Sequence, residues 1–302
     1  MRTIKKVFLL VLAMLGVASV KAEDIQIGDL YYRFNSDSAT VTGCSKNLDN
    51  AVIPDSVEYE GNIYHVYTIG RRAFSNRQKL VSAIIPNSVT IIEDDAFSSC
   101  HLLSMVTIGS GVDSIGNWAF SGCDALNAVI IVDLSSWCAI RLGAANPLYV
   151  AHHLYMNGNL ITELTIPDDV TSISATAFMG AEDLVSTSLP EGLETIGDYA
   201  FANCTEIKTI YCKNPTPPEG SGEKHPFSGM SSSARIYVPI GSGALYKQHP
   251  VWKYYKIVEF DFSSALSEQP SQKDCNGVKY IQNTEKIMLK IVNKLQMLVQ
   301  TT

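Results

Sequence analysis

The sequence of 302 residues lacks a basic excess, because 23 Lys and Arg stand against 30 Asp and Glu, a formal charge of −7. That balance excludes a broad positive surface for nucleic acid and gives no reason to expect attraction to anionic lipid. Cysteine is also scarce. Seven residues are too few for a small disulfide scaffold, and the odd number leaves at least one thiol free or bonded to another chain.

Recognisable catalytic motifs are absent as well. The sequence contains no G-x-S-x-G, no H-E-x-x-H, no phosphate loop and no dinucleotide fingerprint. Two histidines are adjacent, His152 and His153, but neighbouring side chains of an extended segment point to opposite sides and do not chelate one ion together. We therefore expect no enzyme, no cofactor and no metal site.

Long apolar runs are missing except at the start of the chain. Residues 7–20 carry no charge and follow Arg2, Lys5 and Lys6. Fourteen residues are too few for a helix to cross a hydrocarbon core about 30 Å thick, but they suit the core of a signal peptide. With Val20 and Ala22 at the −3 and −1 positions, we expect residues 1–22 to be a signal peptide and the mature chain to be exported, without a membrane span. An uncleaved membrane anchor is the alternative.

What the sequence does have is an internal repeat. Ala-Phe pairs recur at intervals of 23, 23, 58 and 23 residues, ending at Phe74, Phe97, Phe120, Phe178 and Phe201. Each Phe follows an Ile by five residues and precedes a Leu or Ile by six, and mostly apolar residues stand nine and eleven positions after it. A fixed period in the twenties with this alternation is the spacing of a leucine-rich repeat strand, and it predicts a solenoid.

The same spacing sets the expected organisation: a β-rich solenoid of about eight coils of ~23 residues, with a cap at each end. The aromatic residues Tyr246, Trp252, Tyr254 and Tyr255 are expected to close the C-terminal end. The expected parts are a signal peptide (1–22), an N-terminal cap with a first degenerate repeat (23–66), the solenoid (67–212) with an insertion at 133–160, a last repeat with the C-terminal cap (213–262), and a linker with a tail (263–302).

One segment of the tail has a helical pattern. Met288, Val292, Leu295 and Val299 fall on one face of a helix. The pattern is compatible with a docking helix or a secretion tail, and a poorly ordered extension is the alternative.

Several repeats resemble a known family. The motifs at 85–89 (IPNSV), 115–123 (IGNWAFSGC) and 189–193 (LPEGL) are similar to BspA-type leucine-rich repeats, and 235–239 with 252–255 resemble that family's closing unit. The resemblance implies a secreted or surface protein of host-associated bacteria. It also implies adhesion to a protein or glycan on a host or neighbouring cell, and it carries over no catalytic residue.

A binding surface is expected on the outward positions of the repeat strands. This surface is mildly apolar and nearly uncharged, which suits a protein or glycan better than a phosphate. The candidates are Met105, Thr107, Ile130, Ser186, Ser188, Thr209 and Tyr211, together with Trp137 of the insertion. The alternative is a structural envelope component without a dedicated ligand. The sequence does not give the oligomeric state.

Three cysteines share one column of the repeat. Cys100, Cys123 and Cys204 each stand three residues after the Phe, where another coil has Ala181. Stacked coils would bring Cys100 and Cys123 within disulfide range. A column of small buried side chains explains the same pattern and is the favoured interpretation.

Overall fold

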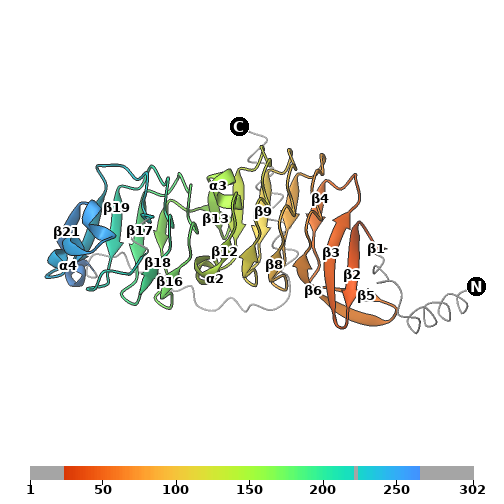
Figure 1. The fold of residues 1–302 in the computed structure, drawn as a ribbon, viewed down its shortest axis with the longest axis horizontal. Coiled ribbons are helices and arrows are strands. Elements are labelled where there is room, and N and C mark those ends of the chain that lie inside the picture. The colour runs from red at the N-terminus through yellow and green to blue at the C-terminus, as the bar shows by residue number, and fades with distance from the viewer. Residues whose placement is uncertain (1–23, 221–223, 266–302) are drawn as a thin grey trace, which may run out of the picture.

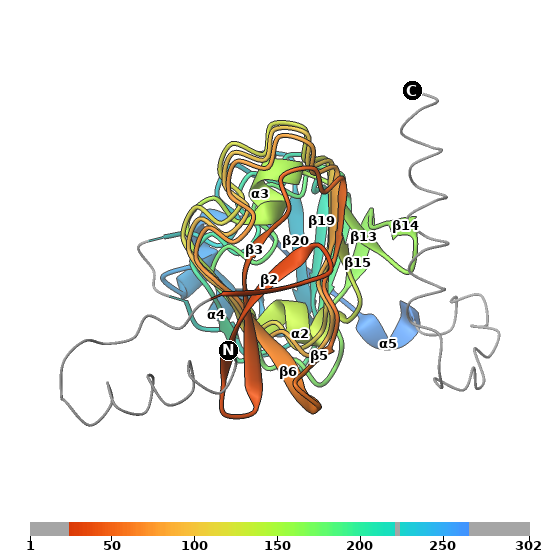
Figure 2. The same cartoon turned by 90° about the vertical axis from the view of Figure 1, so that its right-hand side faces the viewer.

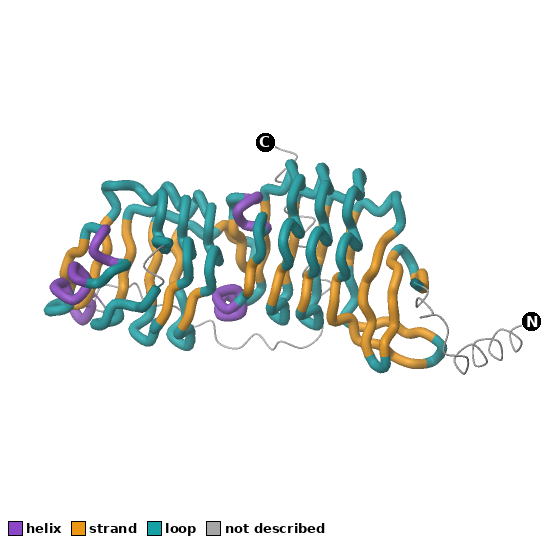
Figure 3. The backbone as a smooth tube through the Cα atoms, viewed as in Figure 1, coloured by secondary structure: helices purple, strands orange, loops and turns teal. Residues whose placement is uncertain are grey.

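The chain forms one elongated solenoid in a computed structural model that describes residues 24–220 and 224–265 (Figure 1). Each coil runs from a strand on one long face, through a turn that carries the repeat Phe, and back (Figure 3). The predicted leucine-rich repeat solenoid is confirmed.

Ten strands line one long face in the described part of the chain. Eight of them belong to the predicted repeats, β13 comes from the insertion, and β21 from the C-terminal cap. The first sheet holds β4 (Asn50–Val52), β7 (Ser82–Ile84), β9 (Met105–Ile108), β11 (Ala128–Ile131) and β13 (Leu154–Met156), with β14 (Asn159–Leu160) antiparallel at its edge. The second holds β15 (Glu163–Thr165), β17 (Ser186–Leu189), β19 (Thr209–Cys212), β20 (Arg235–Pro239) and β21 (Ile257–Phe260).

Shorter strands line a second face. These are β8 (Ile91–Ile92), β10 (Ser114–Ile115), β12 (Arg141–Leu142), β16 (Ser172–Ile173) and β18 (Thr195–Ile196). The N-terminal cap extends this face with the antiparallel strands β1 (Ile25–Ile27), β2 (Leu30–Asn35) and β3 (Ser38–Cys44), and with the hairpin of β5 (Ser56–Tyr59) and β6 (Asn62–Ile69).

The repeat phenylalanines form the centre of the core. Phe97 is fully buried between Phe74 and Phe120, with ring centroids 4.8 and 5.1 Å apart and nearly parallel planes. A second stack joins Phe178, Phe201 and Phe227 at 4.9 and 5.3 Å. The backbone repeats too, because the N–H groups of four of these residues, Phe74, Phe97, Phe178 and Phe201, each donate to a carbonyl of the next coil, as Phe97 does to Ala119 at 2.8 Å. A single coil could not bury these rings alone.

Some coils have a glycine directly after the inward-facing Ile that precedes the repeat Phe, and the missing side chain lets neighbouring coils pack closely. Gly116 is not among the residues with positive φ, so it does not mark a left-handed turn. Instead, a Cβ on Gly116 would lie 2.5 Å from the backbone nitrogen of Asp94 in the preceding coil. The left-handed conformation falls two residues before each Phe, at Arg72, Asp95, Trp118, Thr176 and Tyr199.

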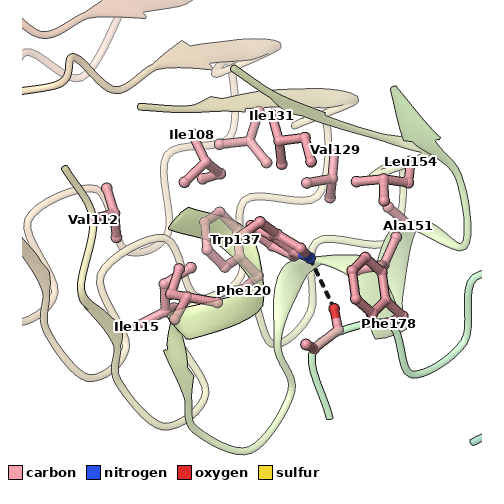
Figure 4. Close-up of a cluster of buried hydrophobic side chains, with 14 of the residues drawn as sticks. Ile108, Val112, Ile115, Phe120, Val129, Ile131, Trp137, Ala151, Leu154 and Phe178 are labelled. Atoms are coloured by element: carbon pink, nitrogen blue, oxygen red, sulfur yellow. Dashed lines mark hydrogen bonds between the residues drawn. The ribbon is translucent and has the colours of Figure 1, made fainter. Parts of the chain in front are cut away.

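The insertion joins two halves of the solenoid. It folds into α2 (Leu134–Ala139) and α3 (Pro147–Ala151), and the Asp133 side chain caps α2 by accepting from the Ser136 N–H. No strand pairing connects β13 to β15 within residues 24–220. The Trp137 side chain fills this break, and its indole N–H donates to the Ala177 carbonyl at 2.9 Å (Figure 4).

Aromatic residues close the C-terminal end. Tyr246 of α4 (Gly243–Gln248) and Trp252 of the following 3-10 helix (Trp252–Tyr254) are fully buried. The Trp252 indole N–H donates to the Pro218 carbonyl at 2.7 Å, and Tyr255 packs against Phe227. Tyr254 is 61% exposed and does not take part, so the prediction was wrong for this residue alone.

The cysteine column is a packing feature. The six cysteines of the described residues are free and buried, so the structure contains no Cys100–Cys123 bridge. Each thiol of the column donates to the carbonyl of the Phe in the preceding coil: Cys100 to Phe74, Cys123 to Phe97, and Cys204 to Phe178. The favoured interpretation of small, buried side chains is confirmed.

Candidate binding surface

The predicted surface lies on the outward positions of the two long sheets, and its two halves differ. In the N-terminal half, Met105, Thr107 and Ile130 are only 2–3% exposed. The expectation that they are exposed was wrong. Their side chains do point away from the main core, but Met105, Ala128 and Ile130 form a second buried cluster with Ile84 and Tyr155.

Trp137 is not exposed either, at 2%. Figure 4 shows its ring among side chains of the core, including Ile108, Ile131 and Phe178. Its expected exposure was therefore wrong, because the break between the two half-solenoids needs a large side chain to fill it. The insertion interrupts the period, so the period could not locate this tryptophan.

The C-terminal half carries the accessible part of the surface. Ser186 and Ser188 on β17, and Thr209 and Tyr211 on β19, are half-buried with their side chains on the outer face. The structure brings these four together, since Ser186 pairs with Thr209 and Ser188 with Tyr211 across the ladder.

Aromatic rings gather beside these hydroxyls. We call Tyr211, Tyr237, Phe260 and Phe262 the outer aromatic patch. Tyr211 stacks on Tyr237 with centroids 5.3 Å apart, and its ring lies 5.9 Å from Phe260 and 6.4 Å from Phe262. All four side chains are half-buried. Of these four only Tyr211 was predicted; Tyr237, Phe260 and Phe262 were not, although Tyr237 occupies the same outward column as Tyr211.

The arrangement suits binding better than chemistry. Partly exposed aromatic rings offer large apolar surface with few rotatable bonds, and tyrosine and serine hydroxyls both donate and accept hydrogen bonds. The patch itself carries no charged side chain, although Arg235 and Glu259 flank it on β20 and β21.

A groove lies on the second face, which is formed by the shorter strands. It is a shallow, open groove of about 470 Å³ across β8, β10 and β12, between Arg71 and Arg141. Its acids support the backbone: Glu93 accepts from the Arg71 N–H at 2.7 Å and Asp94 from the Asn117 N–H at 2.8 Å. These two acids therefore link neighbouring coils through backbone N–H groups.

The histidines tie the insertion to the next coil. The His153 ring contacts the Asp183 carboxylate, and the His152 ring lies 3.3 Å from the Glu182 carboxylate. Within residues 24–220 and 224–265, no group of three His, Cys, Asp or Glu side chains is placed to hold a metal ion. The same residues include no helix long and apolar enough to cross a bilayer.

Comparison with known proteins gives one family. Residues 42–136 and 149–268, more than half of the chain, match the family model described as BspA type Leucine rich repeat region, in six copies. The match indicates no catalytic family. A comparison with curated proteins finds no match.

Solved leucine-rich repeat structures are similar at low identity. A protein from Bacteroides ovatus is 22% identical over 72% of this chain and 71% of that chain, with a TM-score of 0.39. One from Bacteroides capillosus is 28% identical over 44% of this chain and 97% of that chain, with a TM-score of 0.38. A leucine rich cell surface protein from Faecalibacterium prausnitzii is 20% identical over 83% and 98%, with a TM-score of 0.33.

Proposed function

We propose that this chain, which belongs to the BspA-type leucine-rich repeat family, is an exported binding protein that adheres to a protein or glycan at a cell surface. The outer aromatic patch carries the proposal, because it is a cluster of accessible rings on an otherwise regular repeat face. Binding energy at protein surfaces concentrates in a few tyrosine, tryptophan and arginine side chains.

The position of the patch supports this role. The β17 and β19 hydroxyls beside the patch offer hydrogen-bonding groups at its edge. An apolar centre with a polar rim is the usual anatomy of a recognition surface. Export is supported by the sequence of residues 1–22, which lie outside the described residues.

An array of glycans and host-matrix proteins tests the proposal. The mature chain, residues 23–302, is expected to bind a defined subset of spots, and Tyr211→Ala is expected to weaken that signal. Tyr254→Ala serves as the matched control, because Tyr254 is a 61% exposed aromatic outside the patch. Its signal should equal that of the wild type.

Two results would contradict the proposal. Absence of binding above background across the array would favour a structural envelope component without a dedicated ligand. Equal loss for Tyr211→Ala and Tyr254→Ala would show that the patch is not the binding surface. The thermal midpoint of each variant, measured by circular dichroism, separates lost binding from lost folding.

A further inference from the structure

A row of hydroxyl groups crosses the second sheet and runs into the outer aromatic patch. Thr165 on β15 pairs with Ser188 on β17, and the row continues through Tyr211 on β19 to Tyr237 on β20. We call these four side chains the hydroxyl row. Neighbouring strands are about 4.8 Å apart, so the row covers about 14 Å. All four side chains reach solvent, because Thr165 is exposed and the other three are half-buried.

These hydroxyls are unused within the described part of the chain. No side-chain hydrogen bond joins a member of the hydroxyl row, or Ser186 and Thr209 in the next column, to another described residue. Hydroxyls elsewhere on the solenoid bond to a neighbouring coil, as Thr195 does when it donates to Ser172 at 2.7 Å. The hydroxyl row therefore keeps its donors and acceptors for a ligand.

Aromatic rings add an apolar surface at one end of the row. The Tyr211 and Tyr237 rings stack on each other, and Phe260 and Phe262 pack beside Tyr211. Phe262 reaches the patch from α5 (Phe262–Ala265), which lies on the same side of the solenoid as β13 and β15 when the molecule is viewed along its long axis (Figure 2). The chain beyond α5, with the helical pattern predicted at 288–299, lies outside the described residues.

We infer that the outer aromatic patch and the hydroxyl row bind a neutral oligosaccharide. A sugar ring has the same two kinds of surface, because its faces carry C–H groups and its rim carries hydroxyls. The C–H groups pack on the Tyr211 and Tyr237 rings, and the rim hydroxyls exchange hydrogen bonds with Ser188 and Thr165. The inference rests on the proposed function, since it names the class of partner that the same patch binds.

The size of the patch favours a sugar over a protein. If about a third of the roughly 150–250 Å² of each half-buried ring is accessible, the four rings of the patch offer about 200–330 Å². A protein partner typically covers about 800 Å² on each side of an interface. The patch is therefore less than half of a typical protein interface, which suits a short oligosaccharide.

Charge favours a neutral sugar over an acidic one. Residues 23–265 contain 14 Lys and Arg against 27 Asp and Glu, and this excess of negative charge repels a polyanion. The column of Ser186 and Thr209 ends in one charge of each sign, Glu163 on β15 and Arg235 on β20. Glu259 of β21 accepts a hydrogen bond from the Gly243 N–H at 2.9 Å.

Calorimetric titration of the mature chain, residues 23–302, tests the inference. The neutral probes are hexasaccharides of glucose, galactose, mannose and xylose, and the acidic probes are heparin and galacturonate hexasaccharides. The host-matrix proteins of the array are titrated in parallel. We expect at least one neutral hexasaccharide to bind, with an affinity that changes less than about twofold between about 0.05 and 0.5 M salt, because binding forms no ion pair.

Variants separate ring packing from hydrogen bonding. Tyr211→Ala is expected to weaken binding of that hexasaccharide about thirtyfold, because it removes a ring of the patch. Tyr211→Phe and Ser188→Ala each remove one hydroxyl and should weaken it about three- to tenfold. Ser172→Ala is the matched control, because that hydroxyl lies on the second face and bonds to Thr195, and its affinity should equal that of the wild type.

The possible failures are distinguishable. Binding confined to the proteins or the acidic sugars would overturn this inference and leave the proposed function standing. Absence of binding to every probe would overturn both. A neutral hexasaccharide that binds Tyr211→Ala, Tyr211→Phe and Ser188→Ala as tightly as the wild type, with unchanged thermal midpoints, would also overturn the inference, because the sugar would then bind away from the patch.

Discussion

The phenylalanine ladder makes a prediction that can be worked out from the structure. Phe97→Ala removes a ring that is 0% exposed and stacked on both sides. Truncation of a core Phe to Ala costs about 3–5 kcal/mol. Each aromatic pair adds about 0.5–1.5 kcal/mol beyond area burial, which places Phe97 at the upper end, about 5 kcal/mol.

Urea unfolding of the mature chain followed by circular dichroism measures this loss. With an m value of about 3 kcal/mol/M, a loss of about 5 kcal/mol should lower the urea midpoint by about 1.7 M. Leu102→Ala is the control, because Leu102 is 54% exposed and its truncation should cost less than about 0.5 kcal/mol. Neighbouring coils should lose amide protection as well, since each coil is stabilised by contact with the next.

The reasoning would be refuted by a loss below about 1.5 kcal/mol for Phe97→Ala, because that is less than half of the about 3–5 kcal/mol expected for truncating a buried Phe. Equal losses for Phe97→Ala and Leu102→Ala would also refute it.

Three further predictions concern packing, thiols and export. Gly116→Ala should lower the free energy of unfolding by about 1–3 kcal/mol, because the added Cβ would lie 2.5 Å from the backbone nitrogen of Asp94. Gly192→Ala is the control and should not destabilise the protein, because its Cβ would lie 3.8 Å from the nearest atom. Chemical denaturation compares the two variants. Burial raises the pKa of the Cys123, Cys138 and Cys204 thiols to about 12, so the native thiols should resist alkylation at pH 8. Because the unfolded thiols ionise near pH 9 and the native ones do not, the free energy of unfolding should fall as the pH rises from about 9 to 12, and a flat profile there would contradict the assignment. Amino-terminal sequencing of the exported protein should begin at Glu23, and recovery of Met1 would contradict a cleaved signal peptide.

The repeat period predicted the features that every coil shares. The same kinds of residue recur because stacking similar coils gives each position the same neighbours. They are the repeat Phe, the inward strand residues and the small residues of the cysteine column. The period also distinguished inward from outward positions correctly, since Met105 and Thr107 do point away from the main core.

The period could not predict what happens outside the repeat. Alternation along a strand says which face a side chain is on but not what covers that face, which is why Met105 and Ile130 were expected to be exposed. Tyr237 was missed for a different reason. It lies in 235–239, which was assigned to the closing unit, so its outward position beside Tyr211 was not counted with those of the repeat strands.

The central claim is that the outer aromatic patch binds the partner. Its most direct test is the affinity of the mature chain and its variants for a ligand identified on the array. Surface plasmon resonance should show Tyr237→Ala weakening binding about thirtyfold, the equivalent of about 2 kcal/mol, because its ring stacks on Tyr211 at 5.3 Å in the centre of the patch. Trp118→Ala, which alters an aromatic side chain that is 55% exposed, should bind like the wild type. Unchanged affinity of Tyr237→Ala, with its thermal midpoint intact, would contradict the account.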